Sequence, residues 1–265
     1  MNVFRRGLRI ARALLSSQYA VMLEYRAEIA LWALSGVLPL VMLGVWVDSV
    51  GARATGLGPQ QLGPYFLAAF VVRQFTVVWV IQVFEEEALQ GKLSPQLLQP
   101  LHPLWRHLAA HLAEQLTRVP FVLLMLLPLA LLQPALLGRP APLELLLGAL
   151  ATLGAFLLRF LLQALLAMLC FWSERAAALD RLLLIPYLFL SGLVAPLETF
   201  PPAVRQLALA TPFPWMLSFP ARLLAGQPEP VGRGFLALAL WGLLLLPLLA
   251  LAWRAGLRRY SSMGA

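Results

Sequence analysis

Two histidines and a carboxylate form the group best suited to chemistry in this sequence: His107, His111 and Glu114. Spacings of four and three residues place all three on one face of a helix. Imidazole and carboxylate groups arranged in this way can ligate zinc or iron. The acidic run at 85–87 could then supply a general base, which would make the chain a membrane-embedded metalloprotease.

Three motifs typical of proteases are missing. The H-E-x-x-H zinc motif is absent, because Leu108 stands where the glutamate is required. Intramembrane proteases with a Glu-Glu-x-x-x-Arg motif have an arginine where this chain has Gln90. The sequence also contains no G-x-S-x-G element. The metalloprotease is therefore the alternative hypothesis, and an ordinary polar helix face is the simpler interpretation.

The sequence contains no phosphate-binding loop of the G-x-x-x-x-G-K-[ST] type. Its one Gly-Lys pair, Gly91–Lys92, is followed by Leu93, and Glu86 occupies the position of the first glycine. The single cysteine, Cys170, excludes an internal disulfide and a cysteine-rich metal motif. We therefore expect no catalytic, cofactor or metal site in this chain.

Composition indicates a polytopic membrane protein. Hydrophobic residues make up 61% of the chain, charged residues 12%, and the mean hydropathy is +0.80. A soluble domain of this composition would expose large apolar patches. We predict an all-α fold, a single transmembrane domain over residues 1–265, with kinks at its prolines. Six stretches are long enough to cross about 30 Å of hydrocarbon: 29–50, 64–84, 117–137, 143–172, 181–197 and 234–254.

Residues 1–26 carry five arginines and lack the apolar core of a secretory signal. Arg5 and Arg9 fall on one side of a helix, and Leu8 and Leu15 fall on the other. This pattern predicts an amphipathic helix in the membrane interface. A solvated basic leader is the alternative.

The distribution of basic residues predicts the topology. If the N-terminus is cytoplasmic, thirteen lysines and arginines fall on the cytoplasmic side, Arg118 among them, and five, such as Arg53, fall on the other side. Basic residues resist translocation, so both termini should be cytoplasmic, in the inner or plasma membrane. The net charge of +8 then reflects topology and attraction to anionic lipid, and no nucleic-acid partner is expected.

The segment 85–106 is the one long polar loop between apolar stretches, and the topology makes it cytoplasmic. Gly91 can adopt the left-handed conformation that ends a helix. Ser94 and Pro95 are suited to cap and start a new helix, and Pro100 ends it. We expect a two-turn helix whose exposed leucines rest on a partner or on the bilayer surface.

This loop resembles the cytoplasmic loop after the second span of ABC-2-type permeases, the membrane subunits of ATP-binding-cassette exporters. In that family a Gly-x-Leu turn is followed by a Leu-Leu-x-Pro-Leu element. The matching residues are Gly91, Leu93, Leu97, Leu98, Pro100 and Leu101, with Trp105 beyond them. A second match follows the fifth stretch: Ser191, Gly192, Pro196, Leu197, Phe200, Pro201 and Pro212.

The resemblance implies half of an exporter, paired with a second copy or a related permease. Each loop would dock on an ATPase subunit, and that partner would bind ATP and magnesium. Apolar anchors would supply affinity and neighbouring acidic groups orientation. The residues expected to couple to the ATPase are Glu85, Glu86, Glu87, Gly91, Leu93, Leu97, Leu98, Pro100 and Leu101.

The segment 197–231 is too long for a turn and too rich in proline for one span. A short re-entrant pair on the outer side is expected, as in the family, and an amphipathic surface loop is the alternative. The candidate residues for an outer gate are Gly192, Pro196, Phe200 and Pro201.

Two arginines lie deep in apolar stretches, each near a glutamine: Arg73 beside Gln74, and Arg159 one turn before Gln163. A charge at a helix centre costs roughly 2.5 to 3.5 kcal/mol on insertion, so these side chains should face the bundle or an aqueous path. They are candidates for lining the transport route, and structural arginines are the alternative. The apolar spans and the family resemblance favour a lipophilic or amphipathic cargo.

Overall fold

The computed structural model describes residues 3–48, 58–173 and 175–263, and within these ranges it contains helices and no strand. The all-α prediction is therefore confirmed for the described chain. The first two residues of the predicted interfacial helix, and Arg53 in the predicted first outer loop, lie outside these ranges.

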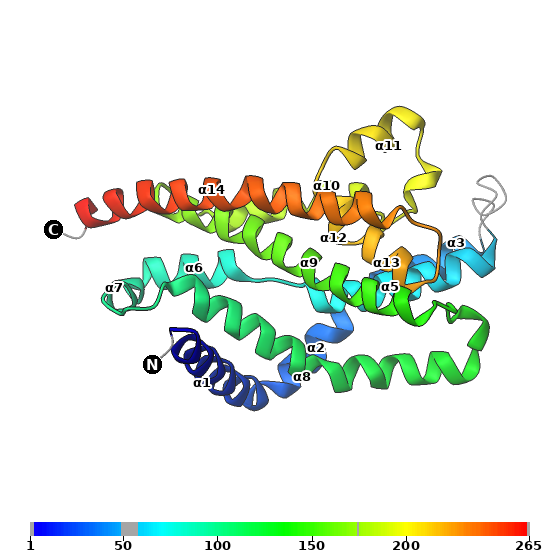
Figure 1. Ribbon diagram of the computed structural model, residues 1–265, viewed down its shortest axis with the longest axis horizontal. Coiled ribbons are helices and arrows are strands. Elements are labelled where there is room, and N and C mark those ends of the chain that lie inside the picture. Colours follow the sequence, from blue (N-terminus) through cyan, green and yellow to red (C-terminus); the bar gives the residue numbers. More distant parts are fainter. Residues whose placement is uncertain (1–2, 49–57, 174, 264–265) are drawn as a thin grey trace.

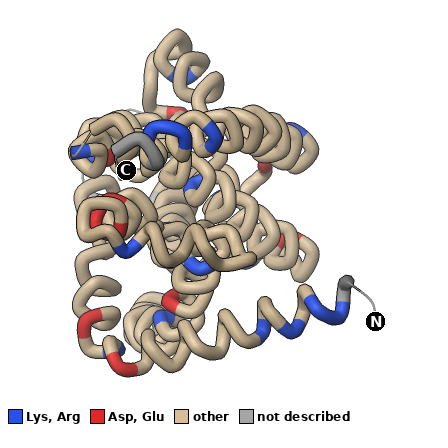
Figure 2. Tube along the Cα trace, turned by 90° about the vertical axis from the view of Figure 1, so that its left-hand side faces the viewer, with Lys and Arg blue, Asp and Glu red and all other residues tan. Residues whose placement is uncertain are grey.

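The N-terminal helix, α1 (Val3–Glu24), packs along the helix α8 (Pro103–Leu132). Arg5, Arg9 and Arg12 on α1 are exposed. Figure 2 shows basic residues spaced along this helix. A helix with an exposed basic side is what the sequence predicted, and its place in the membrane interface stays a prediction.

The first two apolar stretches are each broken in the middle. The first forms α2 (Arg26–Ser35) and α3 (Leu38–Asp48). The second forms α5 (Pro59–Thr76) and α6 (Val80–Leu89), joined by an extended segment at 77–79.

The helices pack closely at the first break. A Cβ atom on Gly36, between α2 and α3, would lie 2.7 Å from Gln74 Nε2, so a larger residue here would displace that side chain of α5. A proline accounts for the first break but not for the second. Pro39 lies in the first turn of α3, where it lacks the N–H that would continue α2. The second break has no proline near it. The helix α8 continues through Pro120 and Pro128, and the last helix continues through Pro247.

Three long helices complete the bundle: α8, α9 (Pro142–Ala167) and α14 (Val231–Met263). The one-turn helix η1 (Pro134–Leu136) separates α8 from α9, and η2 (Met168–Phe171) extends α9. The helix α8 starts fourteen residues before the predicted boundary at 117, because Pro103 occupies its first turn and His102 Nδ1 accepts the Leu104 N–H at 3.3 Å.

The fifth predicted stretch, 181–197, holds only α10 (Ala177–Leu190), a helix of 14 residues. At about 1.5 Å per residue it covers roughly 21 Å, less than the 30 Å of a bilayer core. Five helical segments of the described chain are long and apolar enough to cross a membrane. They confirm a membrane protein with several spans, and the count of six stays a prediction.

Short helices fill the predicted outer segment: η3 (Leu197–Thr199), α11 (Pro202–Leu209), α12 (Phe213–Met216) and α13 (Ser218–Leu224). The helix α13 packs on α5 and α9, with Trp215 and Phe219 buried between the elements. By contrast, α11 stands away from the bundle (Figure 1). The helices α12 and α13 are therefore buried and α11 is not, and the re-entrant pair stays a prediction.

Both ends of the described chain lie at one end of the molecule, together with α7 (Leu93–Leu97) (Figure 1). A second hydrophobic core near this end includes Leu93, Phe84 and Phe171, with Trp253 packed against it. This core fixes the start of α7 to α6, α9 and α14.

Candidate functional site

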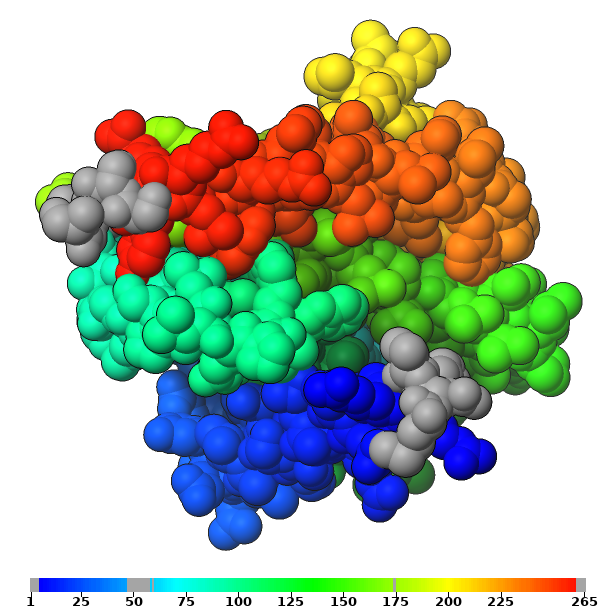
Figure 3. All heavy atoms as spheres, turned by 60° about the vertical axis from the view of Figure 1, so that its left-hand side comes forward, coloured from blue at the N-terminus to red at the C-terminus, as the bar shows by residue number. Residues whose placement is uncertain are grey.

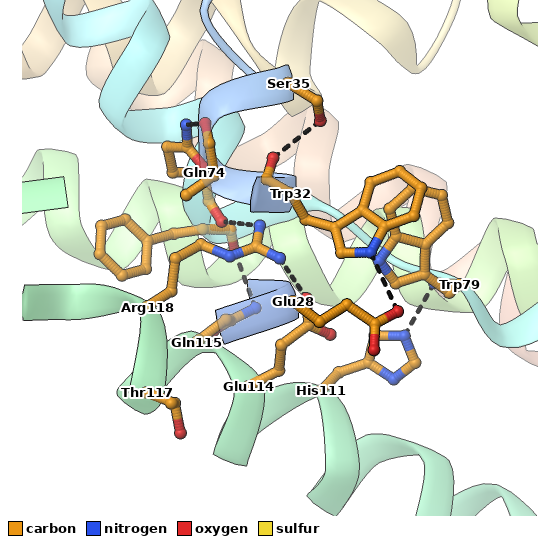
Figure 4. A network of polar contacts seen from close by, with 12 residues as sticks. Glu28, Trp32, Ser35, Gln74, Trp79, His111, Glu114, Gln115, Thr117 and Arg118 are labelled. Carbon is orange, nitrogen blue, oxygen red and sulfur yellow. Dashed lines mark hydrogen bonds and ion pairs between the residues drawn. The ribbon is translucent and has the colours of Figure 1, made fainter. Parts of the chain in front are cut away.

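The break in the second apolar stretch is the centre of a polar network. Because residues 77–79 are extended, α5 and α6 leave backbone groups near the break without helical partners. Each unsatisfied group in hydrocarbon costs several kcal/mol. Side chains from α8 and α9 supply the partners, and Figure 4 shows those from α8.

Two side chains accept backbone N–H groups after the break. The Trp79 N–H donates to His111 Nε2 at 2.8 Å, and the Ile81 N–H donates to Gln163 Oε1 at 3.4 Å. His111 comes from α8 and Gln163 from α9, so the start of α6 is held from both sides.

Two other side chains of α8 donate to carbonyl groups before the break. Arg118 Nη1 donates to the Gln74 carbonyl at 3.0 Å, and Gln115 Nε2 donates to the Phe75 carbonyl at 2.8 Å. Arg118 also forms an ion pair with Glu114 and is only 2% exposed. The topology count placed Arg118 on the cytoplasmic side, which is wrong: it is buried in the bundle. Without Arg118, most of the counted basic residues still fall on the predicted cytoplasmic side.

The three residues of the metalloprotease hypothesis each have another partner. His111 Nδ1 lies 2.7 Å from the His107 carbonyl, so a neutral ring donates there and accepts at Nε2. His107 Nε2 lies 3.2 Å from Glu87 Oε2, and Glu114 pairs with Arg118. In the described ranges, no group of three or more His, Cys, Asp or Glu side chains could hold a metal ion. Nothing in this arrangement supports the metalloprotease.

All four predicted path residues, Arg73, Gln74, Arg159 and Gln163, line one cavity of about 310 Å³. The two glutamines have structural partners. Gln74 Nε2 donates to the Ala33 carbonyl at 2.8 Å, and Gln163 Nε2 donates to Asp180. The structure therefore brings the four residues together, and their part in transport stays a prediction.

The three glutamates at the start of the coupling loop, residues 85–87, have different surroundings. Glu85 Oε2 accepts the Ala177 N–H at 2.6 Å, at the start of α10, and Glu87 faces His107. Only Glu86 is exposed, with Lys92 Nζ 3.8 Å away. A cluster of three acidic groups on a docking surface is therefore not formed, because two of them hold neighbouring helices.

The helix α7 has five residues, fewer than the two turns predicted. Gly91 has φ +69°, as the predicted left-handed turn requires. Ser94 is not the cap, because it lies inside the helix, where its Oγ is 2.7 Å from Tyr260 Oη on α14.

The leucines of the loop differ in exposure. Leu93 is wholly buried, Leu97 and Leu101 are partly buried, and Leu98 is 90% exposed. Pro100 is also exposed. Figure 3 shows the segment around α7 on the surface, between α1 and the end of α14. Leu98 is therefore the one leucine of the four that can enter a partner's groove without leaving a core.

Among the predicted gate residues, Gly192 and Pro196 are buried and Phe200 and Pro201 lie further out. Gly192 has φ +87°, and its carbonyl accepts the Tyr65 hydroxyl at 2.7 Å. A Cβ atom on Gly192 would lie 2.4 Å from Tyr65 Oη. Both the conformation and the contact require glycine at this position.

We expect Gly192→Ala to destabilise the protein by about 1 to 3 kcal/mol, because alanine adds backbone strain and displaces a hydrogen-bonded hydroxyl. Thermal unfolding in detergent would measure the loss. The control is Gly242→Ala in α14, where an added Cβ meets nothing within 4 Å. Equal melting temperatures for both variants would contradict the prediction.

Several polar residues near these sites were not predicted from the sequence. Glu198 pairs with Arg222, and Arg222 Nε lies 3.1 Å from Glu229 Oε2. Burial raises the pKa of Glu229 above its ordinary value, although Arg222 opposes the shift. Asp180 and Tyr187, in the cavity of the path residues, were also missed. The charge of Asp180, directly before an apolar stretch, was the available signal.

Residues 61–264 match the family model described as ABC-2 family transporter protein. No curated protein matches the chain, and no solved structure does. The matched range covers the coupling loop and all the residues that line the cavity except Trp32, Ser35 and Gly36.

Proposed function

Since the chain belongs to the ABC-2 family of transporters, we propose that it is the permease subunit of an exporter driven by a separate ATPase. Members of this family are typically non-catalytic membrane subunits that work with an ABC ATPase. The match over residues 61–264 is the observation that carries the proposal. ATP and magnesium would be bound by the partner, and the permease would pair with a second copy or a related subunit.

The contacts of the coupling loop support a docking role. Leu98 is 90% exposed, and the loop around it is anchored by Leu93 in the core and by Ser94 at Tyr260. An exposed apolar side chain on an anchored loop suits a partner's groove, because the backbone of the loop has little conformational entropy to lose on binding.

A path for coupling leads from α7 to the cavity. The helix α6 connects α7 to the break at 77–79, and residues of the break line the cavity. In our proposal, closure of the ATPases displaces α7, α6 moves as a rigid lever, and the break changes the shape of the cavity.

The proposal is tested by purification in mild detergent and by transport in vesicles. An ATPase with its own phosphate loop should copurify with the permease, and ATP hydrolysis should drive cargo across the membrane. Recovery of the permease without any ATPase from native membranes would contradict the proposal.

We also propose that both termini and α7 are cytoplasmic, with the basic majority and the shared end of the molecule in support. In a Cys170→Ser background, Leu98→Cys should react with a membrane-impermeant maleimide only in inside-out vesicles. Leu207→Cys on α11, at a leucine that is 62% exposed, should react only in right-side-out vesicles. Labelling of both from the same side would contradict this topology.

A further inference from the structure

The cavity at the break has apolar walls and an excess of positive charge. Its volume is about 310 Å³, and residues of α2, α5, α9 and α10 line it. Four of the lining residues are arginines and one is a carboxylate. Leucines, Trp32 and Met216 form much of the remaining wall.

Several buried donors of the residues that line this cavity form no hydrogen bond. Arg73 Nε and Nη1 are buried and make no hydrogen bond, and the same holds for Arg159 Nη1 and the Tyr187 hydroxyl. The Arg159 guanidinium lies over the Tyr187 ring, 4.3 Å from its centroid. Tyr187 itself is only 5% exposed. Three side chains that line the cavity thus carry buried donors without a hydrogen-bond partner.

The acidic groups nearby are already engaged. Arg118, the third deep arginine, is neutralised by Glu114. Both oxygens of Asp180 accept hydrogen bonds from side-chain amides, those of Gln163 and Gln82. In the described part of the chain, neither Arg73 nor Arg159 forms an ion pair with a carboxylate.

We propose that this cavity binds the anionic group, a carboxylate or a phosphate, of an amphipathic molecule, and that this molecule is the cargo. Guanidinium groups pair with such anions through charge-assisted hydrogen bonds, which are about twice as strong as neutral ones. The apolar wall would hold the hydrocarbon part of the ligand. The assignment of the ligand as cargo rests on the proposed function.

The test uses brominated probes, because Trp32 and Trp79 both line the cavity and bromine quenches indole fluorescence at short range. The purified protein in an uncharged detergent is titrated at pH 8 with 12-bromododecanoate and with 12-bromododecanol. We expect the acid to bind at least about tenfold more tightly, as one charged hydrogen bond would give. Equal affinities for the acid and the alcohol would overturn the proposal.

Variants locate the binding. Arg73→Gln and Arg159→Gln should each weaken binding of the brominated acid by about tenfold and leave binding of the brominated alcohol unchanged. Arg159→Lys should retain part of the preference, since it keeps the charge but loses the planar fork. Arg139→Gln, at an exposed arginine outside the cavity, is the matched control and should bind as wild type. Size-exclusion profiles would confirm that each variant is folded, and unaltered acid binding in both cavity variants would overturn the assignment.

A competition experiment distinguishes an amphipathic ligand from a free anion. Dodecyl phosphate should displace the brominated acid at concentrations at least about tenfold lower than inorganic phosphate does, because burial of its chain adds roughly 0.8 kcal/mol per CH₂. Equal potency would show a site for free anions and would overturn the amphipathic ligand. Copurification of the ATPase does not depend on the cavity. If the partner copurifies and the probes fail, only the ligand class is wrong. If the probes bind and no partner copurifies, the binding site stands, and the proposed function is wrong together with the assignment of the ligand as cargo.

Discussion

Leu98→Asp is expected to weaken binding of the partner ATPase by on the order of 100-fold while the permease remains folded. A carboxylate at this position would have to lose its water in an apolar groove, at a cost of several kcal/mol. In the free permease the same side chain stays in solvent, because Leu98 is 90% exposed. Copurification in mild detergent and ATP hydrolysis in liposomes would measure the loss.

Two substitutions control this experiment. Leu207→Asp changes an exposed leucine of α11, far from α7, and should leave ATPase binding unaltered. Leu97→Asp is a poor probe, because Leu97 packs against the core around Phe84 and its loss would also disturb the loop. If Leu98→Asp retains the partner and coupled hydrolysis, α7 is not the docking element.

Local features of the sequence predicted the parts of the fold that depend on local physics. Long apolar stretches gave the membrane-spanning segments, because the thickness of the bilayer fixes their length. Gly91 gave the turn before α7, because few residues other than glycine accept a positive φ. Arg73 and Arg159 of the cavity could be singled out in the sequence, because a charge in hydrocarbon is costly and an arginine in an apolar stretch is therefore unusual.

Features that depend on tertiary contacts could not be predicted in this way. The break at 77–79 lies within a continuous apolar stretch that contains no glycine or proline between 65 and 90. It is stable only because His111, Gln115, Arg118 and Gln163 supply partners from other helices. The periodicity of α8 showed a polar face, but not what the face would contact.

The coupling loop gives a second example. Three consecutive glutamates indicate a solvated acidic patch by composition alone. In the structure, only Glu86 stays exposed, since Glu85 holds the start of α10 and Glu87 faces His107. Which side chains of a polar loop turn inward depends on neighbours distant in sequence.

The largest expected effect on stability comes from Arg118→Leu. Arg118 is 2% exposed, pairs with Glu114 and donates to the Gln74 carbonyl at 3.0 Å. Its removal would leave the half-buried carboxylate of Glu114 and the buried Gln74 carbonyl without this partner. Breaking a buried ion pair in this way costs about 3 to 5 kcal/mol. We expect the melting temperature in detergent to fall by about 10 °C.

The same substitution at Arg159, a half-buried arginine in α9, provides the contrast. Arg159 forms no ion pair with any carboxylate of the described chain and has an unsatisfied Nη1, so Arg159→Leu removes a costly charge and should leave stability unchanged or improved. Adding Glu114→Leu to Arg118→Leu should recover part of the loss, since no unpaired carboxylate remains. The loss of stability that remains in the double variant would measure the contribution of the hydrogen bond from Arg118 to the Gln74 carbonyl. If both single arginine variants melt at the same temperature, the ion pair does not stabilise the broken helix, and the break must be held by His111, Gln115 and Gln163 alone.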